Sequence, residues 1–384
     1  MKSDREINKS TEKKTETGFD PGRRDFGKMA LAGALGGSAL VSFAGSSSAR
    51  VQPIEPGIKL SAQISSNPTD ENLQFIRQLG VEYVNIWTRG DTATYENFVR
   101  LRKLVEGAGL KIWNIGNSDV HNMEEVTLNL PGRDRKVEEY KTYLRNIGKT
   151  GGIYYTTYAH MGNGIWSTER EETRGGASAR AFNLDKATAG YWNRKKFELP
   201  LTHGREFTEK EIWGNYEHFI KEVTPVAEEE GIRIGIHPDD PPVPVLGGVP
   251  RCIFSSFDGY RRAMEIADSP NIGICLCVGC WLEGGDLMGR DVIETIRYFG
   301  KQKKIFKVHF RNVDKPLPYF KETFIDNGYM DMYKVMRALR EVDYDGICIA
   351  DHVPNFASGR GTGLAYSIAY MRALVERAND EFSG

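Results

Sequence analysis

Ile232-Arg233-Ile234-Gly235-Ile236-His237 is an alternating apolar run that ends on a histidine followed by proline. Alternation places the three isoleucines on one face of a β-strand and His237 on the other. Three later strand-like runs also end on a residue that can bind a metal, namely Cys277, His309 and Asp351. Four such strand ends in succession predict a parallel sheet with a single metal site at its carboxyl edge.

Eight strand-like runs occur in the chain, and a longer amphipathic segment follows each of them. The expected strands are 58–64, 83–87, 110–115, 153–158, 232–237, 272–278, 305–310 and 346–351, and the expected helices are 69–79, 94–107, 135–149, 209–230, 256–268, 289–299, 330–342 and 364–378. Eight strand–helix repeats predict an α/β protein with a (β/α)8 TIM barrel. The alternative is a doubly wound sheet, which usually carries a glycine-rich turn after its first strand. The sequence has no such turn there.

The N-terminal segment differs in composition from the rest of the chain. Gly22-Arg23-Arg24-Asp25-Phe26-Gly27-Lys28 precedes a weakly apolar stretch at 29–44 and small residues up to Ala49. This pattern resembles a twin-arginine signal peptide and predicts export by the twin-arginine machinery to a periplasmic or extracytoplasmic location. We expect a signal peptide and disordered N-terminus over 1–50, and one catalytic barrel domain over 51–384.

One segment within the expected barrel is too long for an ordinary turn. Residues 159–208 are rich in glycine, arginine and threonine. A loop of this length at the catalytic end of a barrel commonly covers a substrate. The alternative is a surface excursion without a function.

Composition excludes some classes of protein. The chain has 384 residues, 40% of them hydrophobic and 27% charged, which is ordinary for a soluble globular protein. Its formal net charge is −1 and it has no basic block, so we expect no nucleic-acid partner. The five cysteines are an odd number, and we expect Cys277 to be a metal ligand and the others to be small buried residues.

Strand alternation allows the four strand-end residues to meet. It turns His237, Cys277 and His309 toward the barrel interior, and Asp351 falls at the catalytic mouth. Two imidazoles, a thiolate and a carboxylate suit a borderline divalent ion such as Mn²⁺, Fe²⁺ or Zn²⁺. Ca²⁺ is disfavoured because it prefers oxygen ligands.

Several residues near these strand ends are candidates for proton transfer or substrate binding. His352 is a candidate general acid or base, or a residue that orients Asp351. Tyr366 is a candidate for proton transfer, or a packed aromatic residue. The cations available for a carboxylate substrate are Lys307, Arg311, Arg133 and Arg180, and Arg311 at a strand exit is the best placed of them. Asp239 and Asp240, beside proline, are expected to be turn and capping residues rather than ligands.

Several motifs in order resemble the D-mannonate dehydratases, a family of metal-dependent, xylose-isomerase-like barrels. The motifs are Leu130-Pro131-Gly132-Arg133-Asp134, His237-Pro238-Asp239-Asp240-Pro241-Pro242, Val249-Pro250-Arg251, Leu276-Cys277-Val278-Gly279, Val308-His309-Phe310-Arg311-Asn312, Asp331-Met332-Tyr333, Asp351-His352 and Tyr366-Ser367. The similarity runs from about His121 to Leu374.

The resemblance implies one Mn²⁺ or Fe²⁺ ion, with Zn²⁺ less favoured, bound by His237, Cys277, His309 and Asp351. It also implies that His352 and Tyr366 transfer protons while D-mannonate loses water to give 2-keto-3-deoxy-D-gluconate. The residues expected to bind the sugar acid are Arg311, Asn312, Arg133, His121, Trp166 and Arg180.

The sequence therefore predicts an exported, metal-dependent lyase that acts on a sugar acid, with a homo-oligomer left open. The first alternative is a sugar isomerase or epimerase that uses the same metal. The second is a non-catalytic periplasmic protein that binds a sugar or a metal.

Overall fold

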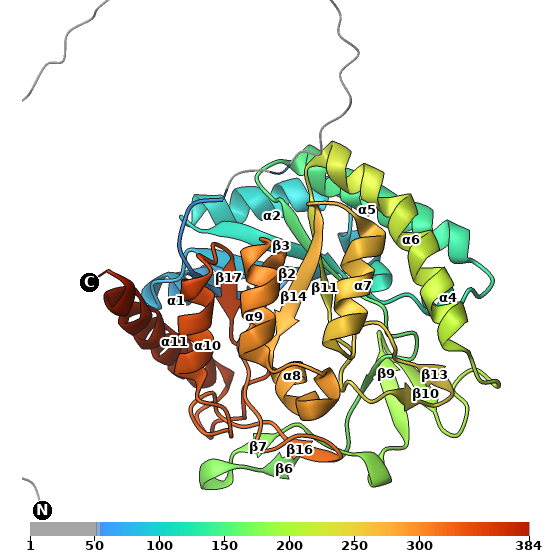
Figure 1. Ribbon diagram of the computed structural model, residues 1–384. Helices are drawn as coiled ribbons and strands as arrows, with labels where there is room; N and C mark the ends of the chain where they lie inside the picture. Colours follow the sequence, from blue (N-terminus) through green and yellow to red (C-terminus); the bar gives the residue numbers. More distant parts are fainter. Residues whose placement is uncertain (1–50, 52–53, 384) are drawn as a thin grey trace, which may run out of the picture. The chain divides into compact units, whose positions relative to one another are not determined.

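The computed structural model describes residues 51 and 54–383, so the predicted signal peptide and disordered N-terminus at 1–50 lie outside the described residues. Eight parallel strands close into a barrel in the described part of the chain (Figure 1). The predicted TIM barrel is therefore confirmed. Among the described residues, no helix combines the length and the apolar character needed to cross a membrane.

The barrel strands match the predicted runs closely. They are β1 (Lys59–Ile64), β2 (Tyr83–Thr88), β3 (Lys111–Asn117), β4 (Tyr155–Ala159), β11 (Arg233–His237), β14 (Ile272–Cys277), β15 (Ile305–His309) and β17 (Ile347–Ile349). Around the barrel their order is β1-β17-β15-β14-β11-β4-β3-β2, and β2 pairs with β1 to close the ring. The last strand is shorter than predicted, so Asp351 lies two residues beyond its end.

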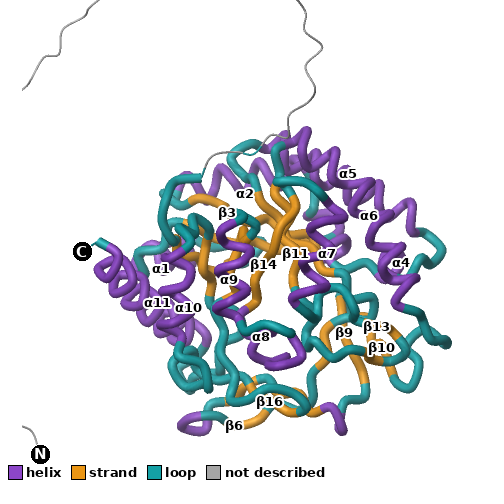
Figure 2. Tube along the Cα trace, in the orientation of Figure 1, coloured by secondary structure: helices purple, strands orange, loops and turns teal. Residues whose placement is uncertain are grey.

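Eight main helices follow the barrel strands and surround them (Figure 2). They are α1 (Asp70–Gln78), α2 (Tyr95–Gly107), α5 (Arg133–Thr150), α6 (Glu209–Glu230), α7 (Phe257–Ala267), α9 (Val292–Lys301), α10 (Met332–Glu341) and α11 (Arg360–Phe382). Shorter helices are α3 (Ser118–His121), α4 (Glu124–Thr127) and α8 (Val278–Gly284), with 3₁₀ turns η1 (Gly90–Thr92), η2 (Arg174–Gly176), η3 (Leu184–Lys186) and η4 (Gly285–Met288). Each predicted helix is present, with its ends moved by a few residues.

Local chemistry explains where these helices begin and end. Thr208 accepts a hydrogen bond from the backbone of Glu211, whose side chain accepts one from the backbone of Thr208, so a capping box starts α6. Gly231 ends the same helix in the left-handed conformation, with φ of 67°, which glycine adopts without strain. Between these caps, buried residues such as Phe219 and Val223 pack against the barrel.

The 159–208 insertion folds into short strands at the carboxyl end of the barrel, in the lower part of Figure 1. Its strands are β5 (Ile165–Trp166), β6 (Glu171–Glu172), β7 (Ser178–Ala179), β8 (Ala181–Asn183), β9 (Ala189–Trp192) and β10 (Lys195–Glu198), and other loops add β12 (Val245–Leu246), β13 (Val249–Pro250) and β16 (Tyr319–Lys321). β5, β9 and β10 form one sheet, and β8 pairs with β16 from the loop after β15. The insertion is therefore tied to a second catalytic-end loop by backbone hydrogen bonds.

Candidate active site

The four residues predicted to bind a metal converge at the carboxyl end of the barrel. His237, Cys277 and His309 are the last residues of β11, β14 and β15. His237 Nε2 lies 3.3 Å from His309 Nδ1. Asp351 Oδ2 lies 3.5 Å from His309 Nδ1 and 3.9 Å from Cys277 Sγ. We refer to these four residues as the ligand set.

The spacing within the ligand set fits a single ion. Atoms bound about 2.0–2.3 Å from a tetrahedral ion are separated by roughly 3.3–3.8 Å. Two of the three distances given above, 3.3 and 3.5 Å, fall within this range, and the third, 3.9 Å, lies just beyond it. Two imidazoles, a thiolate and a carboxylate are thus placed to bind one divalent cation, and the donor types suit a borderline metal.

The surroundings of Cys277 favour its thiolate. Burial by itself raises the pKa of this thiol, but the side chain of Cys280 and the guanidinium of Arg311 hold the pKa well below its ordinary value, as does His237. The N–H of Cys280 lies 3.5 Å from Cys277 Sγ because Cys277 caps the first turn of α8. The thiolate is the form that binds a metal.

His352 lies beside the ligand set and is held by a buried carboxylate. Its Nδ1 lies 2.7 Å from Glu322 Oε1 and 2.8 Å from Arg311 Nη1, and its Nε2 lies 4.0 Å from Asp351 Oδ1. Burial lowers the pKa of His352, but Asp351 and Glu322 together raise it to about 9. Because Glu322 holds Nδ1, Nε2 is the ring nitrogen left to exchange a proton with a substrate.

Two arginines and three carboxylates form a charged network behind the ligand set. The charged network consists of Arg180, Asp240, Glu283, Arg311 and Glu322, all of which are buried. Arg311 donates to Glu283 at 2.7 Å and to Asp351 at 3.1 Å, and its side chain is fully buried. Arg180 donates to Glu322 at 3.0 Å and to Asp240. Both arginines predicted to bind the substrate therefore already bind protein carboxylates.

The structure corrects the expectation for Asp240. This carboxylate is not a turn or capping group; it is 1% exposed and forms ion pairs with Arg180 and Arg311. The two arginines hold the pKa of Asp240 below its ordinary value even though burial raises it. A carboxylate with this burial is stable only when it is paired.

Gly279 explains how Arg311 reaches the network. A Cβ atom at position 279 would lie 2.0 Å from Arg311 Nε, closer than any non-bonded contact allows. Glycine therefore lets the guanidinium lie directly against α8. This close approach gives a physical reason for the glycine two residues after Cys277.

A cavity of about 390 Å³ opens above the ligand set. This size lies within the range of roughly 300–1,000 Å³ that is usual for small-molecule sites. Its lining includes His237, His309, Asp351, His352, Asp240, His121, Gln63, Thr157 and Lys307 from the barrel, and Ile165 and Trp192 from the insertion. With Met161, three insertion residues thus form part of the wall, as expected of a loop that covers a substrate.

Of the other residues predicted to bind the substrate, the structure brings only His121 to the cavity. Its Nδ1 donates to the carbonyl of Thr157, and burial lowers its pKa to about 3, so the ring is neutral. Arg133 does not line the cavity; it bonds Asp134 and Asn129 at the start of α5.

Asn312 and Trp166 are buried behind the cavity wall. Asn312 donates to the carbonyls of Ile325 at 3.2 Å and Met330 at 2.9 Å, so it fixes the loop after β15. The backbone carbonyl of Trp166 accepts a hydrogen bond from Arg180, and its indole is fully buried. In this structure both residues support the site from outside the cavity.

Tyr366 also lies outside the cavity lining. Its hydroxyl accepts a hydrogen bond from Arg174 of the insertion at 3.2 Å, and its ring packs near Phe324 and Phe356. Burial and the nearby Asp326 raise the pKa of its phenol. The structure thus joins Tyr366 to the insertion, while His352 faces the cavity.

Sequence reasoning missed Glu283 and Glu322 and assigned Asp240 to a turn. Glu283 sits on α8, six residues after Cys277, and burial raises its pKa to about 8 despite Arg311. Glu322 directly follows β16, a three-residue strand outside the barrel that is too short to show periodicity in the sequence. The five cysteines form no disulfide. Cys275, Cys280 and Cys348 are buried as predicted, whereas Cys252 is only half-buried.

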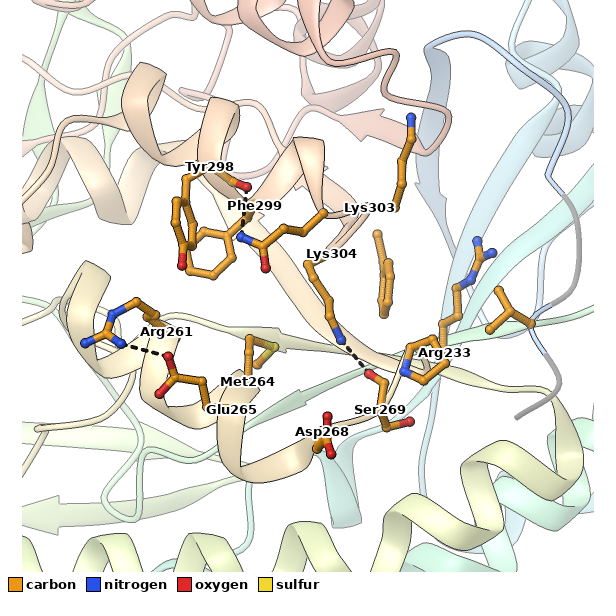
Figure 3. Close-up of a pocket in the computed structure, with 14 residues that line it drawn as sticks. Arg233, Arg261, Met264, Glu265, Asp268, Ser269, Tyr298, Phe299, Lys303 and Lys304 are labelled. Carbon is orange, nitrogen blue, oxygen red and sulfur yellow. Dashed lines mark hydrogen bonds and ion pairs between the residues drawn. The ribbon is translucent and has the colours of Figure 1, made fainter. Parts of the chain in front are cut away.

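A second hollow, of about 460 Å³, lies at the opposite end of the barrel (Figure 3). It is lined by Arg233 at the start of β11 and by Lys304 just before β15. Lys304 donates to the backbone carbonyls of Ser269 and Ile272, the latter at 3.0 Å. Barrel enzymes act at the carboxyl ends of their strands, so this hollow is not the candidate active site.

Comparisons with known proteins agree with the geometry. The family model described as "D-mannonate dehydratase (UxuA)" matches residues 67–380. A mannonate dehydratase of Streptococcus suis (strain 05ZYH33) is 31% identical over 304 residues, which cover 74% of this chain and 81% of that protein. A mannonate dehydratase of Thermotoga neapolitana is 30% identical over 290 residues, which cover 68% of this chain and 78% of that protein.

Solved structures give the same result at the level of the fold. The crystal structure of a mannonate dehydratase from Streptococcus suis serotype 2 superposes with a TM-score of 0.73 at 28% identity, covering 86% of this chain and 95% of that one. A D-tagatose 3-epimerase-like protein superposes with a TM-score of 0.56 at 16% identity, covering 84% and 99%. The second likeness shows the shared barrel alone.

Proposed function

The chain belongs to the D-mannonate dehydratase family, and we propose that it removes water from D-mannonate to give 2-keto-3-deoxy-D-gluconate. The observation that carries this proposal is the ligand set beside His352 at the mouth of a cavity of about 390 Å³. In this reaction the C2–H and C3–O bonds break, water leaves, and the resulting enol becomes the 2-keto acid.

We infer that His237, Cys277, His309 and Asp351 bind one Mn²⁺ or Fe²⁺ ion, with Zn²⁺ less favoured. The mixed nitrogen, sulfur and oxygen donors support a borderline divalent cation. When bound, such an ion supplies Lewis-acid polarisation of substrate oxygens.

His352 is proposed to donate the proton that the departing C3 hydroxyl needs. Its raised pKa of about 9 means that the free imidazole is protonated at neutral pH. Glu322 fixes the ring through Nδ1, so Nε2–H is the group presented to the substrate. Loss of that proton converts the leaving hydroxyl into water.

Tyr366 remains the second proposed proton-transfer residue, as the family resemblance implies. Its hydroxyl is bonded to Arg174 in this structure, so the proposal requires the insertion to release it. His352→Gln and Tyr366→Phe test the two roles separately. Each is expected to lower kcat by about 10²–10⁴-fold, the usual contribution of general acid–base catalysis.

The decisive experiment incubates metal-loaded protein with a panel of sugar acids and assays the 2-keto-3-deoxy product colorimetrically. Product from D-mannonate supports a lyase. An isomerised or epimerised sugar without loss of water would instead support the alternative enzyme class, because there no oxygen leaves. Binding without any chemical change would support the non-catalytic alternative.

We also propose that the protein is exported after it has folded. The support is the sequence Gly22-Arg23-Arg24-Asp25-Phe26-Gly27-Lys28, which resembles a twin-arginine signal. The substitution of lysine for both Arg23 and Arg24 is expected to retain the protein in the cytoplasm, as followed by cell fractionation. Unchanged export of this variant would contradict the proposal.

A further inference from the structure

The cations near the site differ in what they contact. Arg180 and Arg311 bind protein carboxylates in the charged network. Lys307 lines the cavity, yet among the described residues its ammonium forms no hydrogen bond and no ion pair within 4.0 Å. It is 3% exposed. Cys275, Asp351 and Cys277 interact with this charge electrostatically but form no hydrogen bond with it, so a buried cation at this position gains from a direct anionic partner supplied by a ligand.

Lys307 lies one layer below the ligand set. In the register of the barrel it stands beside Cys275 of β14 and Ile347 of β17, while His309 stands beside Cys277 one inward-facing step higher. Because side chains two residues apart share a face of a strand, Lys307 and His309 both point into the barrel. Lys307 therefore belongs to the floor of the cavity, beneath the metal ligands.

Thr157 supplies a second polar group to the lining of the same cavity. It stands beside Gly235 of β11, two residues before the point where Ala159 stands beside His237. Thr157 lines the cavity, is 4% exposed, and its Oγ1 is buried without a hydrogen-bond partner. The cavity lining thus contains an ammonium and a hydroxyl that form no hydrogen bonds with the described residues.

We propose that Lys307 and Thr157 form the subsite that binds the carboxylate of the sugar acid. The inference rests on the proposed function, because it assigns the acid group of that substrate. Lys307 lines the cavity, whereas Arg180 and Arg311 bind protein carboxylates, so Lys307 is the lysine placed to meet a substrate anion. A neutral sugar would leave the buried ammonium unpaired and is therefore disfavoured.

This subsite also orients the substrate. With the carboxylate on the floor, the chain of the sugar acid extends toward the rim, where His352 lies. C2 and C3 then follow the carboxyl carbon toward the residue that handles the proton. Arg311, predicted from sequence to bind the acid group, is replaced in this role by Lys307.

The test compares Lys307→Met with the wild type, both loaded with the same metal. Methionine keeps the length of the side chain and removes its charge. The KM for D-mannonate and the Kd for D-gluconate, measured by titration calorimetry, are expected to rise by roughly 10- to 100-fold, as for loss of a hydrogen bond to a charged group. Binding of neutral D-mannitol and the metal content are expected to stay unchanged.

Lys304→Met is the matched control. Lys304 is a partly buried lysine on the approach to the same strand, but it lies in the hollow at the opposite end of the barrel (Figure 3). Its replacement is expected to leave both constants unchanged. Thr157→Val supplies an independent variant of the same shape, expected to raise KM by about 3- to 10-fold through loss of one hydrogen bond.

Unchanged D-gluconate binding in Lys307→Met would overturn the subsite. So would a loss of metal accompanied by equal losses of affinity for D-gluconate and for neutral D-mannitol. If the methionine variant fails to fold, Thr157→Val and Lys307→Arg decide, and wild-type affinity in Thr157→Val then counts against the proposal. Product formation from D-mannonate with the same KM in wild type and Lys307→Met leaves the proposed function standing and removes the subsite. If the wild type forms no product but its binding of D-gluconate depends on Lys307, the subsite stands and the proposed function is wrong.

Discussion

The two ends of the barrel each gather buried or half-buried cations, but they use them differently. At the amino-terminal end, Lys304 donates to the backbone carbonyls of Ser269 and Ile272, and Figure 3 shows the first of these bonds. At the carboxyl end, Arg180 and Arg311 bind carboxylates, and Lys307 faces the cavity. The first arrangement satisfies the backbone and so serves the fold. The second concentrates side-chain charge where a ligand can enter.

The difference follows from the direction of the strands. All eight strands are parallel, so the residues that end them meet at one end and the residues that begin them meet at the other. A substitution at the carboxyl end should therefore alter binding and chemistry, whereas an equivalent one at the amino-terminal end should alter stability alone.

The largest effect is expected for Cys277→Ser. A hydroxyl is a harder and less acidic donor than a thiol, so metal affinity should fall by more than about 100-fold; residues that only hydrogen-bond a ligand already contribute about 10- to 100-fold. Elemental analysis after dialysis and the rate of product formation measure the change. Full metal content in this variant would remove Cys277 from the ligand set.

Arg311→Met should have the next largest effect, on stability. It leaves Glu283, Asp240 and Glu322 without one of their two guanidinium partners, and breaking a buried ion pair costs about 3–5 kcal/mol. The free energy of unfolding in urea measures this loss. Lys304→Met, the comparison from the opposite end, should lose only about 1 kcal/mol. Equal losses of unfolding free energy in Arg311→Met and Lys304→Met would contradict the difference proposed between the two ends of the barrel.

The pH dependence of stability should depend on His352. Its pKa is raised in the folded protein, from an unfolded value of about 6.5 to about 9. Its stabilising contribution is therefore complete below about pH 6.5 and is lost as the pH rises through about 9. The Tm of the wild type should fall across this window more steeply than that of His352→Gln. Parallel curves would show that His352 gains no stabilising charge on folding.

The smallest effect is expected for Arg133→Ala. The side chain of Arg133 bonds Asp134 and Asn129 and does not line the cavity. We expect KM for D-mannonate within about twofold of the wild type and a stability change below about 1 kcal/mol, as for an exposed ion pair. A large rise in KM would show that α5 contributes to substrate binding after all.

The site could be predicted in part because strand ends are visible in the sequence. His237, Cys277 and His309 were placed by alternation and by the polarity of parallel strands. Asp240 was assigned to a turn because Asp beside Pro is common in turns, and local sequence does not show that two distant guanidinium groups lie against it. Arg311 was expected to face the substrate for the same reason: its carboxylate partners come from other parts of the chain.

The sequence by itself determined the barrel, its strands and helices, and the four residues of the ligand set, because periodicity and strand polarity are local properties. The tertiary structure alone decided which charges neutralise one another: Arg180, from the insertion, meets Asp240, Glu283 and Glu322 from three separate segments of the chain. It also decided that Lys307 faces the cavity while Arg180 and Arg311 do not. Ion pairing depends on distances between residues far apart in the chain, and only the folded chain sets those distances.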